Sequence, residues 1–359
     1  MGMEKTAKIK YRRSHSKKCS KIEALSNAQK IAFAPFTFQA VASMLDMGIL
    51  KFLDEKNADL NEIINGCNIS KYTALTLLQV AFYAGIVEKE NDKFSLSYLG
   101  ECFLHDEMTV NNFNFMRDVC YLGASELTES FVKSTPAGLQ KYFVNAPTIY
   151  PHVPNLPEKA RKSWYDFDYF YSDNSFEDVL KIIFKDDIKE IFDIGGNAGK
   201  FEKVCLKEHP DCRVNIIDLP VNKKIAENNV NSTNLTFYGV DVLSDDKFPQ
   251  ISGAVLMSQF LDCFSEAQVE KILKKVKNAS KSGTKVYILE PVIDNQEFEG
   301  AAFAISHISL YFTCMANGNS KMYTLNELTS LVRNSGLEIE RIHTNVGVHC
   351  YTLLECCVK

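Results

Sequence analysis

Three glycines follow an apolar run in the stretch "IFDIGGNAGKFEKV", residues 191–204, and open a segment of helical character. Gly195, Gly196 and Gly199 can form the tight turn through which a backbone approaches a nucleotide-type cofactor at the start of a helix. Such a turn alone is compatible with NAD, FAD, S-adenosylmethionine or no ligand. Its spacing also departs from the dinucleotide form G-x-G-x-x-G, so the cofactor has to be inferred from further residues.

Aspartates mark the ends of three successive predicted strands, at Asp193, Asp218 and Asp241. Asp218 lies about 20 residues beyond the turn, where a carboxylate can accept hydrogen bonds from both ribose hydroxyls. Asp241 can meet the exocyclic amine of an adenine. Asp193 would repel a pyrophosphate, but it suits the ammonium of a methionyl group. The pattern therefore favours S-adenosyl-L-methionine as the cofactor.

The elements that must position these residues alternate from residue 188 onward. Five apolar stretches predict buried strands: "IKEIFDIGG", "RVNIIDLP", "LTFYGVDV", "ISGAVLMSQFLD" and "TKVYILEPV". Helical segments lie between or after them, and "LEIERIHTN" and "CYTLLECCV" predict a strand pair at the far edge of the sheet. This order is typical of a doubly wound α/β sheet, with its ligand at the carboxyl ends of the strands.

The N-terminal part has a different texture. Residues 34–104 show helical spacing with short connections, Ser70 is a suitable N-cap, and the stretch after Gly85 predicts a hairpin turning at residues 90–92. Helix, turn, helix and hairpin together predict a winged helix. The helix after Ser70 offers only one basic side chain, Lys71, and a broad apolar side, which argues against DNA binding and favours packing against another subunit.

Residues 108–185 predict a second helical region, interrupted by prolines. Its end is dense in aromatic side chains, namely Trp164, Tyr165, Phe167, Tyr169, Phe170 and Tyr171. They suit either an interdomain core or an aromatic lid over a planar ligand. Both interpretations remain open from the sequence.

Composition bounds the class of protein. With 359 residues, 46% of them apolar, the chain can form two hydrophobic cores, and its net charge of −5 gives no global bias toward nucleic acid. The lysine-rich start predicts a solvated arm, with contact to nucleic acid or to an anionic surface as the alternative. Eleven scattered cysteines without ligand spacing predict reduced thiols in a cytoplasmic protein and no metal site. No apolar run reaches the roughly 18 residues of a membrane span.

Five segments carry a family resemblance: "DIGGNAGKF", "IIDLPVN", "VDVL", "LDCFSEAQVEKILKKV" and "LEPV", in this order. Together they resemble the plant- and bacterial-type small-molecule O-methyltransferases, the group that includes caffeate and hydroxyindole O-methyltransferases. The resemblance implies a Rossmann-like, class I S-adenosylmethionine methyltransferase sheet. It also implies an N-terminal all-helical winged-helix domain that forms a homodimer.

Domain boundaries follow from this resemblance and from the texture of the chain. We expect a basic flexible arm over 1–30, the winged-helix dimerisation domain over 31–105, a helical linker and substrate-pocket region over 106–185, and the methyltransferase domain over 186–359.

The resemblance also assigns cofactor contacts residue by residue. The three glycines would shape the turn, Asp218 with Leu219 would hold the ribose, and Asp241 with Val242 would frame the adenine. Ser258 stands where many members of the family have a cofactor-contacting lysine.

The catalytic motif departs from the family. Asp262 stands where the family has a histidine as general base, in "LDCFSE". A carboxylate of ordinary pKa near 4 is a weak base toward a phenol near 10, although burial can raise its pKa. Glu290 matches one of the two acidic partners of that histidine, and Met322 replaces the other. His307, one helical turn from Tyr311, is a further candidate that could assist.

The sequence thus predicts a homodimeric S-adenosylmethionine-dependent methyltransferase that acts on a small hydroxylated aromatic molecule, without membrane or nucleic-acid partners. Oxygen is the expected acceptor atom, with nitrogen and carbon as variants. Two alternatives stay open: a protein that binds the cofactor without methyl transfer, and a winged-helix regulator with a ligand-sensing domain.

Overall fold

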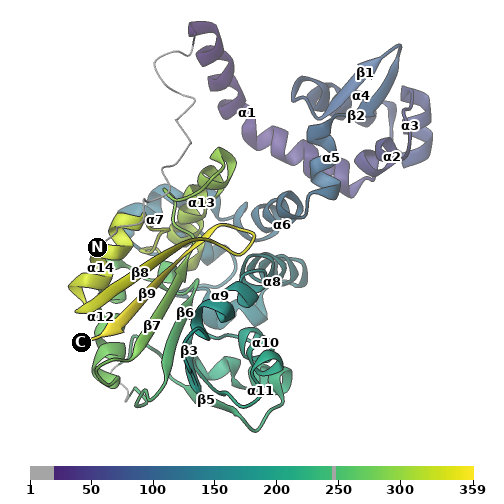
Figure 1. Ribbon diagram of the computed structural model, residues 1–359. Coiled ribbons are helices and arrows are strands. Elements are labelled where there is room, and N and C mark those ends of the chain that lie inside the picture. The colour runs from purple at the N-terminus through teal and green to yellow at the C-terminus, as the bar shows by residue number, and fades with distance from the viewer. Residues whose placement is uncertain (1–19, 245–247) are drawn as a thin grey trace. The chain divides into compact units, whose positions relative to one another are not determined.

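The computed structural model describes residues 20–244 and 248–359, which divide into two compact units, residues 20–118 and residues 119–359 (Figure 1). The lysines and arginines predicted to form a basic arm before residue 20 lie outside the described residues. Helix α1 begins at Lys21, within the segment expected to be an arm, and Ser20 caps it by accepting a hydrogen bond from the backbone of Glu23.

The first unit is mainly helical. Its elements are α1 (Lys21–Asp46), α2 (Ile49–Glu55), α3 (Leu60–Cys67), α4 (Lys71–Tyr83), β1 (Val87–Glu90), β2 (Lys93–Leu96), α5 (Tyr98–His105) and α6 (Glu107–Phe115). The predicted cap is confirmed, because the Ser70 hydroxyl accepts from the backbone of Thr73 at 3.0 Å. The predicted hairpin is also present, with β1 antiparallel to β2, so this unit is not all-helical.

Helices α1 and α4 expose large apolar side chains. On α4 the exposed fraction is 79% for Tyr72, 43% for Phe82 and 85% for Tyr83. On α1, Phe33 and Phe36 are likewise exposed. Among the described residues, no single helix is long and apolar enough to cross a membrane; α1 and α2 pass that test only as a pair bent by 65°.

The second unit is built on a seven-stranded sheet in the order β5-β4-β3-β6-β7-β9-β8 (Figure 1). Its strands are β3 (Glu190–Ile194), β4 (Arg213–Asp218), β5 (Leu235–Gly239), β6 (Ala254–Ser258), β7 (Lys285–Glu290), β8 (Leu337–Val346) and β9 (Tyr351–Val358). Strands β3 to β7 are parallel, and β9 and β8 add an antiparallel pair beside β7. This confirms the five predicted strands and the terminal pair at the sheet's edge.

Two layers of helices cover the sheet because its central strands are apolar on both faces. Phe192 and Ile194 face a core shared with α12 (Glu266–Ala279) and α14 (Leu325–Asn334). Ile191, the residue before Phe192, faces the opposite core, shared with α9 (Phe176–Ile183) and α10 (Lys200–Glu208). The alternation places the strands' carboxyl ends between the layers, which is where such a fold binds its ligands.

The remaining helices of this unit are α7 (Leu127–Lys133), α8 (Glu158–Asp173), α11 (Lys223–Val230) and α13 (Glu299–Tyr311). Helix α8 carries the predicted aromatic cluster and is tied to the end of the sheet, because Tyr351 of β9 donates a hydrogen bond to the carbonyl of Tyr171 at 2.9 Å. A π-helical turn, Phe312–Ala316, continues α13.

Leu256 in the central strand tests this core. Its side chain is fully buried, so Leu256→Ala should lower the free energy of unfolding of this unit by about 2–5 kcal/mol. Trp164, the single tryptophan of the chain, lies in the same unit and reports its unfolding in urea through fluorescence. Val348→Ala, at a position 71% exposed, is the control and should leave the midpoint unchanged. Equal midpoints for both variants would contradict the assignment of this strand to the core.

Candidate active site

The glycine turn follows β3 and leads into α10. Gly195 and Gly199 have φ of +88° and +74°, in the left-handed region that favours glycine. A Cβ on Gly195 would lie 2.3 Å from a ring carbon of Phe260, and one on Gly199 would lie 2.7 Å from Val230. Both positions therefore need glycine for conformation and for space.

Asp218, at the end of β4, fastens this turn. Its Oδ2 accepts a hydrogen bond from the backbone of Asn197 at 2.7 Å, and its Oδ1 accepts from the backbone of Leu219 and from the side chain of Asn222 at 3.1 Å. Burial raises the pKa of this carboxyl above its ordinary value, while these hydrogen bonds oppose the shift. Asp218 thus lies beside the turn, as a ribose-binding residue must.

Two carboxyl groups lie beneath the turn. A Cβ on Gly196 would come within 3.0 Å of Glu202 Oε1 and 3.1 Å of Asp193 Oδ2. Both acidic side chains are buried, at 0% and 4% exposure, and burial raises the pKa of Asp193 to about 7 and that of Glu202 well above its ordinary value. Burial therefore disfavours the ionised form of both carboxyl groups.

The other expected cofactor residues surround the same strand ends. Asp241 follows β5 and is exposed, with its Oδ1 accepting from the backbone of Leu243 at 2.9 Å, while Val242 is buried. Ser258 ends β6, and its buried hydroxyl has no hydrogen-bond partner. Unpartnered buried polar atoms are rare in folded proteins, and this hydroxyl is free to form a hydrogen bond with a bound group.

These residues fit S-adenosyl-L-methionine. A turn that tolerates no Cβ at two glycines, a carboxylate beside it, and an unpartnered hydroxyl at the next strand end provide a backbone cradle with polar groups around it. Among the described residues, no three or more His, Cys, Asp or Glu side chains are grouped so that they could hold a metal ion.

The acceptor side of the site is a carboxyl pair. Glu290 ends β7 and is 2% exposed, and its Oε1 accepts from the backbones of Phe260 and Leu261 at 3.0 and 2.7 Å. Asp262 follows in the same turn at 5% exposure. The second Glu290 oxygen, Oε2, and Asp262 Oδ1 are both buried without a partner.

Burial sets the acidity of this pair. It raises the pKa of Asp262 to about 6, and burial together with the charge of Asp262 raises that of Glu290 further above its ordinary value. Hydrogen bonds from the neighbouring Cys263 and from the backbone limit the shift of Asp262. Asp262 is therefore a stronger base than an ordinary aspartate, and Glu290 holds the turn that presents it.

Two further side chains that the sequence did not single out support this turn. Asn317 donates to the carbonyl of Cys263 at 2.6 Å, and Tyr323 donates to that of Phe264, also at 2.6 Å. Polar residues that bond distant carbonyls leave no spacing signal in a sequence, which is why they were missed.

His307 lies in different surroundings. Its side chain is exposed, its Nδ1 lies 2.7 Å from the carbonyl of Phe303, and its ring stacks on that of Phe303. Tyr311, in contrast, is buried and accepts a hydrogen bond from Trp164, so the two do not share one environment. Within the described part of the chain, the contacts of the His307 ring are with Ser306 and Phe303 of its own helix, and not with Asp262. Met322 is buried and brings no charge.

Helix α8 adds a residue that the sequence did not reveal, Asp168. It accepts a hydrogen bond from Asn197 of the glycine turn at 3.3 Å, and burial raises its pKa to about 7. An acidic residue on a polar helix is ordinarily solvent-exposed. The sequence does contain one signal: aromatic residues stand on both sides of Asp168 and continue along the helix, so the helix has no purely polar face for it.

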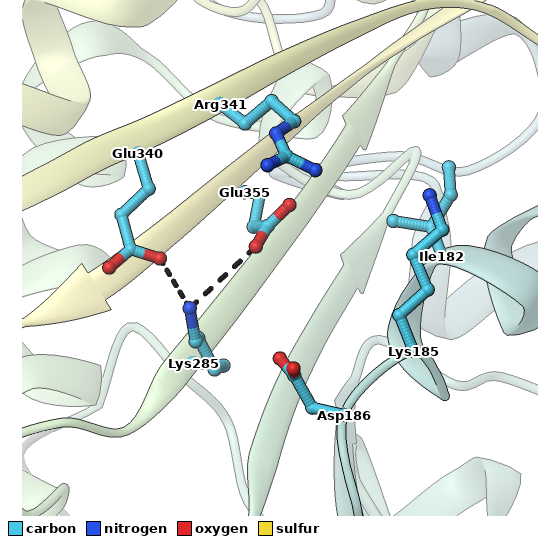
Figure 2. A pocket seen from close by; sticks show the side chains of 7 residues that line it. All are labelled: Ile182, Lys185, Asp186, Lys285, Glu340, Arg341 and Glu355. Atoms are coloured by element: carbon cyan, nitrogen blue, oxygen red, sulfur yellow. Dashed lines mark hydrogen bonds and ion pairs between the residues drawn. The ribbon is translucent and has the colours of Figure 1, made fainter.

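A pocket of about 400 Å³ lies at the start of β7, at the opposite end of this strand from Glu290 (Figure 2). Its Lys285 is paired with Glu340 and Glu355, and the remaining lining includes charges of both signs from Asp186 and Arg341. These ion pairs tie β7, β8 and β9 together. The pocket has none of the glycine-turn residues and is not the methyl-transfer site.

The sheet, glycine turn and strand-end carboxylates define a class I S-adenosylmethionine-dependent methyltransferase. A family model described as an O-methyltransferase domain matches residues 172–338, and a dimerisation2-like domain matches residues 26–94. The chain is 22% identical to 3-hydroxy-5-methyl-1-naphthoate 3-O-methyltransferase of Streptomyces sahachiroi, over 83% of this chain and 85% of that protein.

The name of a second relative indicates methylation at a carbon atom. L-tyrosine C(3)-methyltransferase of Streptomyces lavendulae is 21% identical over 82% of this chain and 81% of its own length. The solved structure of the S-adenosylmethionine-dependent methyltransferase SibL has a TM-score of 0.69 at 18% identity, covering 93% of this chain and 99% of that one. The chain belongs to the S-adenosylmethionine-dependent small-molecule O-methyltransferases, and its cofactor is S-adenosyl-L-methionine.

The carboxyl pair beneath the turn makes stability depend on pH. Because folded-state pKa values of Asp193 and Glu202 are raised above those of the unfolded chain, the folded protein binds more protons, and stability falls as pH rises from about 4 through 7. Glu202→Gln removes the contribution of Glu202 to this loss. We expect its Tm to exceed that of the wild type at pH 8, by about 2–4 °C per kcal/mol, and the gap to narrow at pH 5.

Thermal unfolding at both pH values checks this, with Glu208→Gln, an exposed position on the same helix, as the control. A Glu202→Gln variant that is less stable than the wild type at pH 8 would show that the carboxyl pair stabilises the fold.

Proposed function

We propose that this methyltransferase transfers the methyl group to a hydroxyl of a small aromatic molecule, with Asp262 as general base. The observation that carries the proposal is the pair of unpartnered, buried oxygens, Asp262 Oδ1 and Glu290 Oε2, at the end of the sheet that holds the cofactor turn. A hydroxyl placed there would donate its hydrogen to one of these oxygens, and it would accept a hydrogen bond from the other carboxyl group when that group is protonated. The aromatic side chains of α8 support a flat acceptor.

The chemistry needs alignment and one proton transfer. When bound, S-adenosyl-L-methionine supplies an electrophilic methyl group on a sulfonium. Asp262 orients the acceptor hydroxyl through a hydrogen bond and takes its proton as the oxygen loses electron density. Glu290 keeps Asp262 in place through its hydrogen bonds to the backbone of the turn. The pKa of about 6 leaves Asp262 unprotonated at neutral pH, as a base must be.

The cofactor contacts are part of the same proposal. Gly195, Gly196 and Gly199 form the backbone cradle, and Asp218 with Leu219 holds the ribose. Asp241 and Val242 frame the adenine, Asp193 faces the methionyl ammonium, and Ser258 contributes its hydroxyl. The backbone conformations of the glycines and the unpartnered hydroxyl of Ser258 support this arrangement.

We further propose a homodimer in the cytoplasm, without membrane or nucleic-acid partners. The exposed aromatic side chains of α1 and α4 support dimerisation through the N-terminal unit, because large exposed apolar surfaces on a soluble unit mark interaction sites. All the cysteines that the structure describes are free thiols, which is typical of a reducing compartment.

Methyl transfer to a panel of phenols, with isotope-labelled cofactor, tests the proposed function. Label in an ether product supports it. Label on ring carbon would move the assignment to carbon methylation. Tight cofactor binding without label in any product would favour a protein that uses the cofactor otherwise.

The pH profile tests the base. Because Asp262 must be unprotonated, kcat/KM should rise with pH through about 6 and level off above it. Asp262→Asn should lower kcat/KM by about 100-fold or more and abolish the rise. Glu266→Gln, an exposed acid in the following helix, is the matched control and should keep the wild-type profile.

Binding of S-adenosylhomocysteine, measured by calorimetry, shows that each variant is folded. A profile that Asp262→Asn leaves unchanged would exclude Asp262 as the base.

A further inference from the structure

Two hydrogen-bond donors near the acceptor side of the site are buried and have no partner among the described residues. One is the hydroxyl of Tyr150, at the start of the 3₁₀-helical turn Tyr150–Asn155, and the other is the side-chain amide nitrogen of Gln259, directly after β6. The mechanism proposed above uses the carboxyl groups of Asp262 and Glu290 and neither of these donors. A buried donor without a partner is unfavourable, so both favour a ligand that brings an acceptor atom.

Hydrogen bonds place Tyr150 beside the turn that contains the proposed base. The amide of Ile149 donates to the carbonyl of Ala316 at 2.8 Å, and the side chain of the next residue, Asn317, donates to the carbonyl of Cys263 at 2.6 Å. Burial raises the pKa of Tyr150, and the neighbouring Cys263 adds to this shift, which agrees with these contacts. A thiol is a weak hydrogen-bonding group, so Cys263 does not replace a partner for the Tyr150 hydroxyl.

Gln259 is held in a strained conformation. Its φ of +50° lies in the left-handed region, which is unfavourable for a residue with a Cβ and is found most often at functional sites. Its backbone amide donates to the carbonyl of Leu289 at 2.8 Å, and its side-chain oxygen accepts from the Tyr351 hydroxyl at 3.2 Å. These contacts use the oxygen end of the side-chain amide and leave its nitrogen for a ligand.

The backbone of Gln259 also adjoins the acceptor carboxyl pair. The residue after it, Phe260, donates its amide to Glu290 Oε1 at 3.0 Å. Leu289, which accepts from the amide of Gln259, directly precedes Glu290. The residue before it is Ser258, on the cofactor side. Gln259 therefore stands where the two sides of the site meet.

We propose that the Tyr150 hydroxyl and the Gln259 amide donate hydrogen bonds to a carbonyl oxygen of the methyl acceptor. The acceptor is then a hydroxylated aromatic molecule that carries a carbonyl group besides its reacting hydroxyl, and the inference rests on the proposed function of the same site. A carbonyl oxygen has two lone pairs and no hydrogen, so it can accept from both donors. A carboxylate suits this position less, because Asp262 is ionised in the proposed mechanism and would repel it.

Tyr150 and Gln259 are thus specificity residues. An acceptor with an alkyl group in place of the carbonyl would leave both donors buried and unpaired, which a site built on hydrogen bonds discriminates against.

Matched phenols test this inference. The 3- and 4-hydroxyacetophenones and the corresponding isopropylphenols have similar shapes and differ in the carbonyl oxygen. Their binding to protein saturated with S-adenosylhomocysteine is measured by calorimetry, and their methylation by kcat/KM with labelled cofactor. The variants are Tyr150→Phe and Gln259→Met. The control is Tyr287→Phe, because the Tyr287 hydroxyl is also buried without a partner but its side chain lies in the core shared with α9 and α10.

Wild-type protein should bind at least one hydroxyacetophenone about tenfold more tightly than the matching isopropylphenol. Tyr150→Phe and Gln259→Met should each lower this preference by about threefold or more without changing isopropylphenol binding, and Tyr287→Phe should keep it.

Equal binding within both pairs by the wild type, an unchanged preference in either variant, or an equal loss of both members of a pair overturns the inference. A loss of S-adenosylhomocysteine affinity in Gln259→Met also overturns it, because the amide then serves the cofactor. If the preference depends on both residues but no probe is methylated, the proposed function fails while the inference stands. If both members of each pair bind equally and are methylated, the inference fails alone.

Discussion

Burial of carboxyl groups without matching positive charge is the constraint on which this site depends. Asp193, Glu202, Asp262 and Glu290 are all nearly or fully buried around the carboxyl ends of parallel strands. Removing an ionised carboxylate from water is expensive unless a partner replaces the water, so such groups raise their pKa and hold protons. A cationic cofactor and a proton-donating acceptor are the ligands that reduce this penalty. The buried carboxyl groups of the protein thus favour these two kinds of ligand.

The fold makes this arrangement possible because different elements form the cofactor side and the acceptor side of the site. The glycine turn and Asp218 come from adjacent strands and form the cofactor side, whereas the turn that contains Asp262 is held from several directions by Glu290, Asn317 and Tyr323. Helix α8 contacts both parts of the site: Asp168 accepts a hydrogen bond from Asn197 of the glycine turn, and the carbonyl of Tyr171 accepts one from Tyr351, which also donates to Gln259 after β6. If Asp262 is the general base, as we propose, these contacts hold it in place to align an acceptor without a histidine.

The sequence predicted the elements with strong periodicity or local signals. The strands, the hairpin at residues 90–92, the Ser70 cap and the glycine turn all depend on neighbouring residues, and a local pattern specifies them. It could not predict that Asp168 accepts a hydrogen bond from Asn197 of the glycine turn, nor that His307 stacks on Phe303 of its own helix. It also could not predict that Asp218 binds Asn197 across 21 residues of sequence. Long-range contacts of this kind depend on tertiary packing rather than on spacing.

The proposed mechanism depends on Asp262, which stands where the family has a histidine. A crystal structure with S-adenosylhomocysteine and a methyl acceptor bound tests it most directly. If Asp262 is the base, the reacting hydroxyl lies about 3 Å from Asp262 Oδ1. Glu290 still accepts hydrogen bonds from the backbone of Phe260 and Leu261 in that complex. An acceptor whose reacting atom lies beyond hydrogen-bonding distance of Asp262, or beside His307, would contradict it.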